Sequence, residues 1–246
     1  MKKLLLLVLL LPGALFAQGS IETDRPGHTE TTATVLKSRF QMEMGFEHDQ
    51  TESNASELLL PAILSKVGIT NKIEVRLVTN FEYNKAGDST ASGLGPVTVG
   101  AKVKLWKQKK VLPQTSLIAQ VQLPKVASGD LRAEHVAPQL QLLFQNTLTK
   151  DISLGYNIDA RWDGLNINPE FEYTVSPSYK FSSKIKGFVE VFGFIIKEEN
   201  FDNWVDGGFT YLITKDIQVD ISGGYELTPH SHFHQYFETM GLSFRI

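Results

Sequence analysis

The chain has 246 residues, with 24 Lys and Arg, 27 Asp and Glu, six His and no Cys, which gives a formal net charge of −3. The lack of a basic excess argues against nucleic acid as a partner, and the lack of Cys excludes disulfides and a lipid-modified N-terminal cysteine. The mean hydropathy is −0.11, and no apolar run is long enough for a helix to span a bilayer, so a helical membrane protein is excluded.

Residues 1–17 have the pattern of a secretory signal peptide. Lys2 and Lys3 precede an apolar run over 4–11, and Ala14-Leu15-Phe16-Ala17 supplies a small-residue cleavage site. Cleavage there leaves 22 basic against 27 acidic residues, a net charge of −5. We therefore expect an exported protein, either a soluble periplasmic β protein or an outer-membrane barrel.

Residues 18–37 form a polar N-terminal segment without the period of a strand. One interpretation is a periplasmic lead-in that has no fixed partner. The other rests on Asp24, Arg25 and Pro26, where a charged pair stands beside a rigid turn. On this second interpretation the segment folds into the mouth of a barrel and pairs with charges in the lumen.

About twelve segments between residue 38 and the C-terminus alternate apolar and polar side chains, at the length that a tilted membrane strand needs. Between these segments, short turns alternate with longer polar loops. The longer loops are expected at 49–56, 85–93, 126–135, 163–169, 198–200 and 228–232. This pattern predicts an all-β fold, a single closed antiparallel transmembrane β-barrel of about 12 strands over residues 38–246.

Two segments, 58–67 and 187–196, are apolar on both faces, so their registers stay open; we place Glu190 on the inner face. Charged residues on the polar faces are the expected lining of a wet lumen and the path of a solute. They are Glu43, Glu74, Arg76, Glu82, Lys102, Lys104, Asp159, Arg161, Glu172, Lys180, Glu190 and Asp220. A soluble sandwich would turn the same residues to water.

Aromatic residues near the ends of the expected strands fit interfacial girdles. They are Phe40, Tyr83, Trp106, Trp162, Tyr179, Trp204 and Tyr236.

The last eight residues, 239–246, alternate up to the carboxyl end and carry Gly241 among the polar positions. Their order resembles the terminal signal by which the outer-membrane assembly machinery recognises β-barrel clients. An even number of strands would leave both termini in the periplasm and let the last strand pair with the first, which removes the unpaired edges.

Several stretches resemble a known family. The opening ETDRPGHTET at 22–31, the strand FQMEMGF at 40–46, VGITNKIEVR at 67–76 and Gly100-Ala101-Lys102 resemble the meta-pathway phenol-degradation family of outer-membrane transporter proteins. The resemblance runs from about residue 21 to the C-terminus. It implies an outer-membrane β-barrel that passes small hydrophobic or aromatic compounds, and it carries over no catalytic residue.

No motif predicts catalysis or a cofactor. The chain has no G-x-S-x-G and no phosphate loop, and we expect no enzyme. The only candidate metal ligands are His230, His232 and His234, which alternate along one side of an extended segment. Solvated loop histidines are the more ordinary interpretation of that pattern, because no carboxylate or cysteine stands beside them.

Three functions remain open on the sequence. They are a channel for small hydrophobic or aromatic solutes, a non-conducting barrel that acts as an anchor or adhesin through its loops, and a soluble periplasmic β protein. The partners expected for a channel are outer-membrane lipid, the barrel-assembly machinery and a small-molecule solute, and nucleic acid is not among them.

Overall fold

The computed structural model describes residues 19–132, 135–165, 168–195, 201–229 and 232–246, and the expected signal peptide lies outside these ranges. The described strands are β1 (Phe40–Glu52), β2 (Ala55–Gly68), β3 (Ile73–Ala86), β4 (Ser89–Leu94), β5 (Val97–Trp106), β6 (Gln114–Leu123), β7 (Ala137–Thr147), β8 (Ile152–Arg161), β9 (Glu170–Lys180), β10 (Ile185–Ile195), β11 (Asp202–Thr214), β12 (Ile217–Glu226) and β13 (Tyr236–Arg245). One 3-10 turn, η1 (Gly129–Leu131), follows β6. Among the described residues no helix has the length and apolar character needed to cross a membrane.

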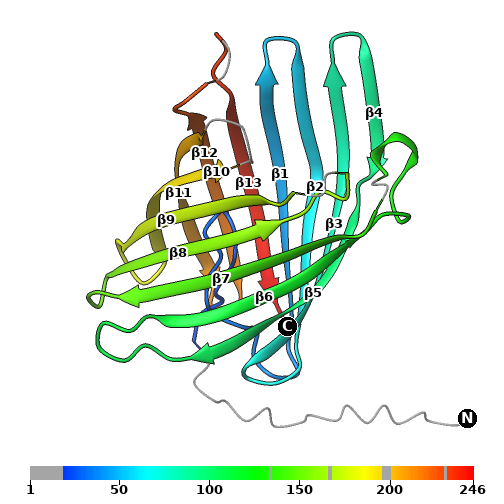
Figure 1. Cartoon of the computed structure of the whole chain (residues 1–246). Coiled ribbons are helices and arrows are strands. Elements are labelled where there is room, and N and C mark those ends of the chain that lie inside the picture. The colour runs from blue at the N-terminus through cyan, green and yellow to red at the C-terminus, as the bar shows by residue number, and fades with distance from the viewer. Residues whose placement is uncertain (1–18, 133–134, 166–167, 196–200, 230–231) are drawn as a thin grey trace, which may run out of the picture.

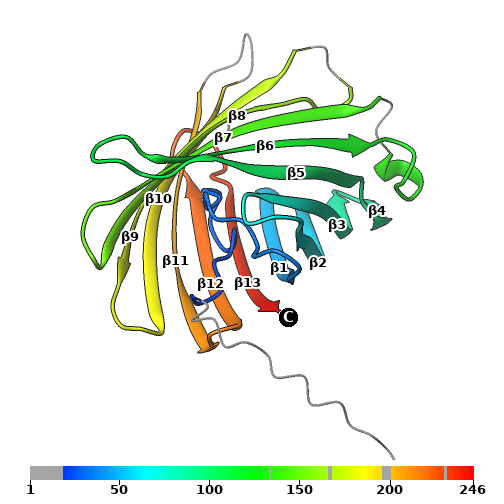
Figure 2. The ribbon, with the colours of Figure 1, turned by 90° about the horizontal axis from the view of Figure 1, so that it is seen from below.

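The strands close into a ring (Figures 1 and 2). Each strand is antiparallel to its neighbours, and β1 pairs with β2 on one side and with β13 on the other, from Gln41 opposite Arg245 to Gln50 opposite Tyr236. The pairing of β2 with β3 completes a ring of 12 of the described strands, and the additional strand β4 pairs with the second half of β3. The predicted closed 12-stranded barrel is confirmed, and closure leaves the ring without a free edge.

Two of the expected loops, 49–56 and 85–93, are wrong. β1 and β2 run on to a tight turn after Glu52, and β3 and β4 pair up to Ala86 and Ser89. β4 continues the path of β5 after a break at 95–96, because β3 pairs with β5 in its first half and with β4 in its second. Polar side chains do not end these strands, because cross-strand backbone pairing continues through them.

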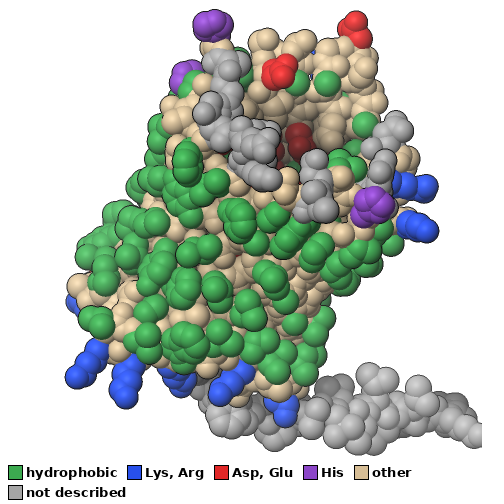
Figure 3. Space-filling model, viewed as in Figure 1, with side chains coloured by type: hydrophobic (Ala, Val, Ile, Leu, Met, Phe, Trp, Pro, Cys, Tyr) green, Lys and Arg blue, Asp and Glu red, His purple; other side chains and the backbone are tan. Residues whose placement is uncertain are grey.

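Side chains are distributed inside-out relative to a soluble protein. Large apolar residues of the strands are exposed on the outer wall, for example Val75 at 47 % and Met240 at 58 %, whereas Glu74 and Lys102 inside are 0 % exposed. Figure 3 shows the apolar side chains covering the outer wall, with a row of Lys and Arg at the lower end and a few more at the upper right. This is the distribution expected of a barrel in lipid with a polar interior, because a soluble β protein would bury the apolar face.

The two open registers are now defined. In β10, Glu190 and Phe192 are buried inside while Val189 and Val191 are exposed outside. In β2, a register shift lies between Leu59 and Ala62, so Lys66 turns inward. We call the end that carries the turns 69–72, 107–113, 148–151, 181–184 and 215–216 the turn end, and the opposite end the loop end.

Candidate functional site in the barrel lumen

Residues 19–37 lie inside the barrel, and we call them the plug (Figure 2). The plug enters at the turn end, where the backbone N–H of Ile21 donates to the carbonyl of Lys215 at 2.7 Å. It returns to the same end, where Thr34 donates to the carbonyl of Asn71 at 3.3 Å and Lys37 forms a bridge with Gly68. The segment without strand period therefore has fixed partners in the lumen.

Asp24 is the centre of the plug's contacts. Its carboxylate lies 2.7 Å from Nζ of Lys66, 2.7 Å from Nζ of Lys102 and 3.4 Å from Nη1 of Arg76. Glu43 of β1 accepts the backbone N–H groups of Asp24 and Arg25 at 2.9 and 3.0 Å. Burial alone would raise the pKa of Asp24, but the positive charges of Lys102, Lys66 and Arg76 hold it well below its ordinary value.

Arg25 reaches the strands that close the ring. Its guanidinium donates to Asp220 of β12 at 3.2 Å and to Oγ1 of Thr239 of β13 at 2.6 Å. Gly45 of β1 and Gly241 of β13 are opposite each other, and a Cβ on either glycine would overlap the Arg25 side chain. The glycine of the terminal motif therefore leaves the space in which this arginine lies.

Glu30 of the plug binds Arg76 of β3, the same arginine that lies near Asp24. Glu30 forms a bidentate pair with Arg76, at 2.6 and 2.8 Å, the geometry in which an arginine holds a carboxylate most firmly. Further along, the backbone N–H of Val35 donates to Glu74 at 2.6 Å. Glu74 and Arg76, two of the β3 residues expected in the lumen, therefore both bind the plug.

His28 and Thr29 bind β9 and β10. Glu190 accepts the backbone N–H of His28 at 2.7 Å and that of Thr29 at 2.6 Å. The His28 ring donates from Nδ1 to Glu172 at 3.2 Å and stacks on Phe192, with ring centroids 3.8 Å apart. The ring is thereby held between carboxylates on one side and an aromatic face on the other.

The pKa of His28 follows from these neighbours. Its enclosure in the lumen would lower the pKa, but the hydrogen bond to Glu172 and the negative charges of Glu172, Glu190 and Asp206 raise it from 6.5 to about 9. His28 is therefore an imidazolium at neutral pH, a cation that the plug presents to an acidic wall.

The remaining predicted lumen residues lie away from this network or at its margin. Arg161 joins Glu172 at 2.6 Å and Glu170 at 3.1 Å, and Asp159 accepts from Gln141 at 2.8 Å. Three predicted lumen residues make no ion pair within 4 Å inside the described ranges: Glu82, Lys104 and Lys180. Pro26 contributes its carbonyl, which accepts from Ser222 at 3.4 Å.

Three residues were missed or misplaced by sequence reasoning. Lys66 lies in a segment that is apolar on both faces, so nothing marked its inward face. His28 was not among the residues expected in the lumen. The ETDRPGHTET stretch that carries it also carries Asp24, Arg25 and Glu30, and that shared motif was the available signal. Trp204 does not belong to a girdle, because it faces the lumen and stacks on Phe192 at 5.9 Å.

Two of the three candidate metal ligands, His232 and His234, lie in the described part of the chain. His230 lies outside it. His234 stacks on Tyr225 with centroids 4.9 Å apart, and its Nδ1 lies 3.0 Å from the carbonyl of Glu226. Among the described residues no group of three or more His, Cys, Asp or Glu could hold a metal ion.

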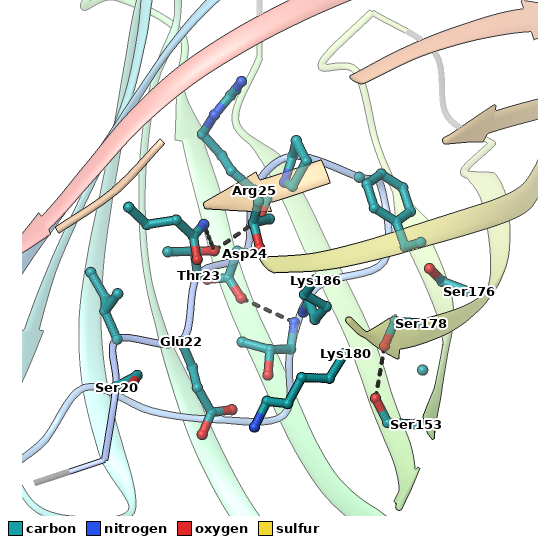
Figure 4. Close-up of a pocket in the computed structure, with 18 of the residues that line it drawn as sticks. Ser20, Glu22, Thr23, Asp24, Arg25, Ser153, Ser176, Ser178, Lys180 and Lys186 are labelled. Atoms are coloured by element: carbon teal, nitrogen blue, oxygen red, sulfur yellow. Dashed lines mark hydrogen bonds between the residues drawn. The ribbon is translucent and has the colours of Figure 1, made fainter. Parts of the chain in front are cut away.

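A cavity of about 430 Å³ lies between the plug and the wall formed by β7 to β12 (Figure 4). Side chains from the turn-end halves of these strands line it, among them Ser153, Ser178, Lys180 and Lys186. Residues 19–31 of the plug form the opposite side. The lumen is therefore filled by the plug on one side and open to a small molecule on the other.

A closed barrel of 12 strands with an apolar outer wall and a polar, plugged lumen has the fold of outer-membrane channels and porins. The family model described as "Putative MetA-pathway of phenol degradation" matches residues 23–246, and the chain belongs to this family. No curated protein matches the chain.

Solved structures share the fold at low identity. An outer membrane channel from Pseudomonas putida F1 has a TM-score of 0.70 at 10 % identity, over 90 % of this chain and 99 % of that one. The porin NanC has a TM-score of 0.58 at 11 % identity, over 82 % and 98 %. The toluene transporter TodX of Pseudomonas putida has a TM-score of 0.51 at 8 % identity, over 88 % and 95 %.

Proposed function

We propose that the protein is an outer-membrane channel for small hydrophobic or aromatic solutes, and that the plug closes its lumen. The observation that carries this proposal is the way the plug is held. Between residues 22 and 33 the described contacts to the wall run through side chains, and no backbone ladder joins the plug to a strand. The plug can therefore leave the lumen without breaking any strand pairing of the barrel.

The orientation and the partners belong to the same proposal. The signal peptide directs export, the assembly machinery inserts the barrel through its final strand, and the turn end with both termini faces the periplasm, as short turns do in such barrels. Outer-membrane lipid covers the apolar wall, and the protein works without catalysis. The solute class is supported by the family description and by the similarity in fold to TodX, a toluene transporter.

Planar-bilayer recording tests the channel. The full chain and a variant that lacks residues 21–36 are inserted in potassium chloride, and we expect the deletion to raise the single-channel conductance severalfold. Heat-modifiable migration on gels controls for the folding of both barrels. Absence of conductance in both folded forms would reject the channel and favour the non-conducting anchor.

The solute class needs a separate measurement, because small aromatics also cross lipid unaided. Uptake of labelled toluene at low concentration is compared between cells that express the protein and cells that lack it. We expect faster uptake with the protein present. Equal rates, from cells whose protein conducts ions in bilayers, would leave the channel standing and reject the solute class.

A further inference from the structure

Two lysines are directly opposite each other on the cavity wall. Lys180 of β9 and Lys186 of β10 are cross-strand partners, and both line the cavity beside the plug. Like charges in this relation destabilise a sheet. Within the described residues neither lysine has a carboxylate within 4 Å. The pair therefore places two positive charges on one cavity without a counter-ion in contact.

The acids of the plug that border the cavity are engaged elsewhere, with one exception. Asp24 is held by Lys66 and Lys102, and Glu30 by Arg76. Glu22 alone has no ion pair within 4 Å among the described residues. In Figure 4 its side chain and that of Lys180 point into the same end of the cavity. The carboxylate of Glu22 can therefore take the place of a bound anion beside the two lysines.

The rest of the wall offers hydroxyl groups and an apolar side. Ser153 and Ser178 are hydrogen-bonded to each other at 2.8 Å, and both line the cavity. Hydroxyl groups can donate to a carboxylate as readily as to each other. Phe188 and Leu212 add apolar surface to the same wall. A ligand that satisfies all three features has an anionic head and an apolar body.

We propose that this cavity is a binding site for a small organic carboxylate, held by Lys180 and Lys186 through its carboxylate and by the apolar wall through its body. Glu22 competes for the same lysines. The site deepens the proposed function, on which it rests, by adding an anionic member to the solute class at the turn end of the lumen. Binding itself does not require that the channel conducts.

Isothermal titration of the full-length protein in detergent tests the site, with benzoate as the probe. Benzyl alcohol serves as its uncharged counterpart of similar shape. The double variant Lys180→Gln/Lys186→Gln should bind benzoate at least about tenfold more weakly, since hydrogen bonds to charged groups are lost. Glu22→Gln should bind benzoate severalfold more tightly, because the internal competitor is removed.

Lys109→Gln is the matched control, because Lys109 is exposed on a turn at the same end and does not line the cavity. It should bind benzoate as the wild type does, and heat-modifiability should be unchanged in all variants. Equal binding of benzoate and benzyl alcohol, or no benzoate binding by the folded wild type, would overturn the proposal. Loss of bilayer conductance with benzoate binding intact would instead reject only the channel.

Discussion

At the scale of single residues, Asp24 is the contact on which the plug depends most. Asp24→Asn removes the carboxylate between Lys66 and Lys102 and leaves two buried ammonium groups with fewer partners. Breaking a buried ion pair from one side costs about 3 to 5 kcal/mol, and here Glu43 and Glu30 offset part of that loss. We expect residues 19–37 to lose protection in hydrogen–deuterium exchange while the strands keep theirs.

Asp88→Asn is the control for this substitution. Asp88 is exposed in the turn between β3 and β4 at the loop end, and it has no ion pair with the plug among the described residues. Its variant should exchange as the wild type does. Unchanged protection of the plug in Asp24→Asn would show that the neighbouring contacts hold the segment without this carboxylate.

His28 makes the docking of the plug dependent on pH. Its pKa is raised from 6.5 to about 9 by the acidic wall, so the protonated ring stabilises the docked state. This contribution is fully present below pH 6.5 and is lost as the pH rises through about 9. We expect exchange of the plug to increase between pH 8 and 10, after correction for the intrinsic exchange rate.

His28→Gln separates this titration from others. In this variant the plug should be docked less stably at neutral pH. Its hydrogen exchange should no longer rise near pH 9, because glutamine does not titrate. A step of the same size in the variant would assign the pH dependence to a different group.

The sequence could be interpreted most directly at residues whose neighbours along the strand alternate regularly. Glu43 in β1 and Glu74 in β3 each stand between apolar residues in an alternating pattern, and their side chains lie in the lumen. Lys66 escaped prediction because its strand contains a register shift, which changes the face on which later residues lie. His28 escaped because its partners are 144 and more residues away in the chain.

At the scale of elements, β13 is the strand that closes the ring, with β1 on one side and β12 on the other. Phe244 alternates with the inward Ser243 and Arg245, in the same outward set as Met240 and Leu242. Phe244→Asp places a charge on the lipid face, at a cost on the order of a few kcal/mol at the midplane and less near the interface. Deletion of 239–246 removes seven of the ten residue pairs between β13 and β1.

We expect both changes to leave export intact and to yield periplasmic, protease-sensitive protein without a heat-modifiable band, the deletion more completely than the substitution. Phe244→Leu is the conservative control and should assemble. A normal amount of heat-modifiable protein after the deletion would mean that β13 does not close the barrel in the cell.

The sequence predicted the strands that cross the bilayer better than the parts beyond it. In the membrane, lipid on one side and the lumen on the other impose strict alternation, and the pattern is visible in the chain. Beyond it, the loop-end parts of β1 to β4 carry mostly polar residues on both faces, so they lose the alternation while keeping the backbone pairing. The loops expected at 49–56 and 85–93 were wrong for this reason.

At the scale of the whole molecule, the ring and the plug are held by different interactions. Strand pairing closes the ring, whereas side-chain contacts hold the plug. The plug's position in the lumen rests on a charge network shared by β1, β2, β3 and β5 on one side and β9 to β13 on the other. No local pattern in the sequence encodes such a network, since its members are brought together only after closure.

A covalent tether tests whether displacement of the plug controls permeability. Oγ1 of Thr29 on the plug lies 2.7 Å from Oγ1 of Thr174 on β9, so cysteines at both positions can form a disulfide, and the chain has no other cysteine. Thr29→Cys and Thr174→Cys are combined with Asp24→Asn, which loosens the plug. In bilayers we expect the oxidised protein to conduct no more than the wild type and dithiothreitol to raise its conductance severalfold.

The control is Asp24→Asn with Thr29→Cys alone, which should conduct equally with and without the reductant. Equal conductance of the oxidised and reduced double-cysteine protein, with the crosslink verified by mass spectrometry, would show that the solute path does not run through the space that the plug fills.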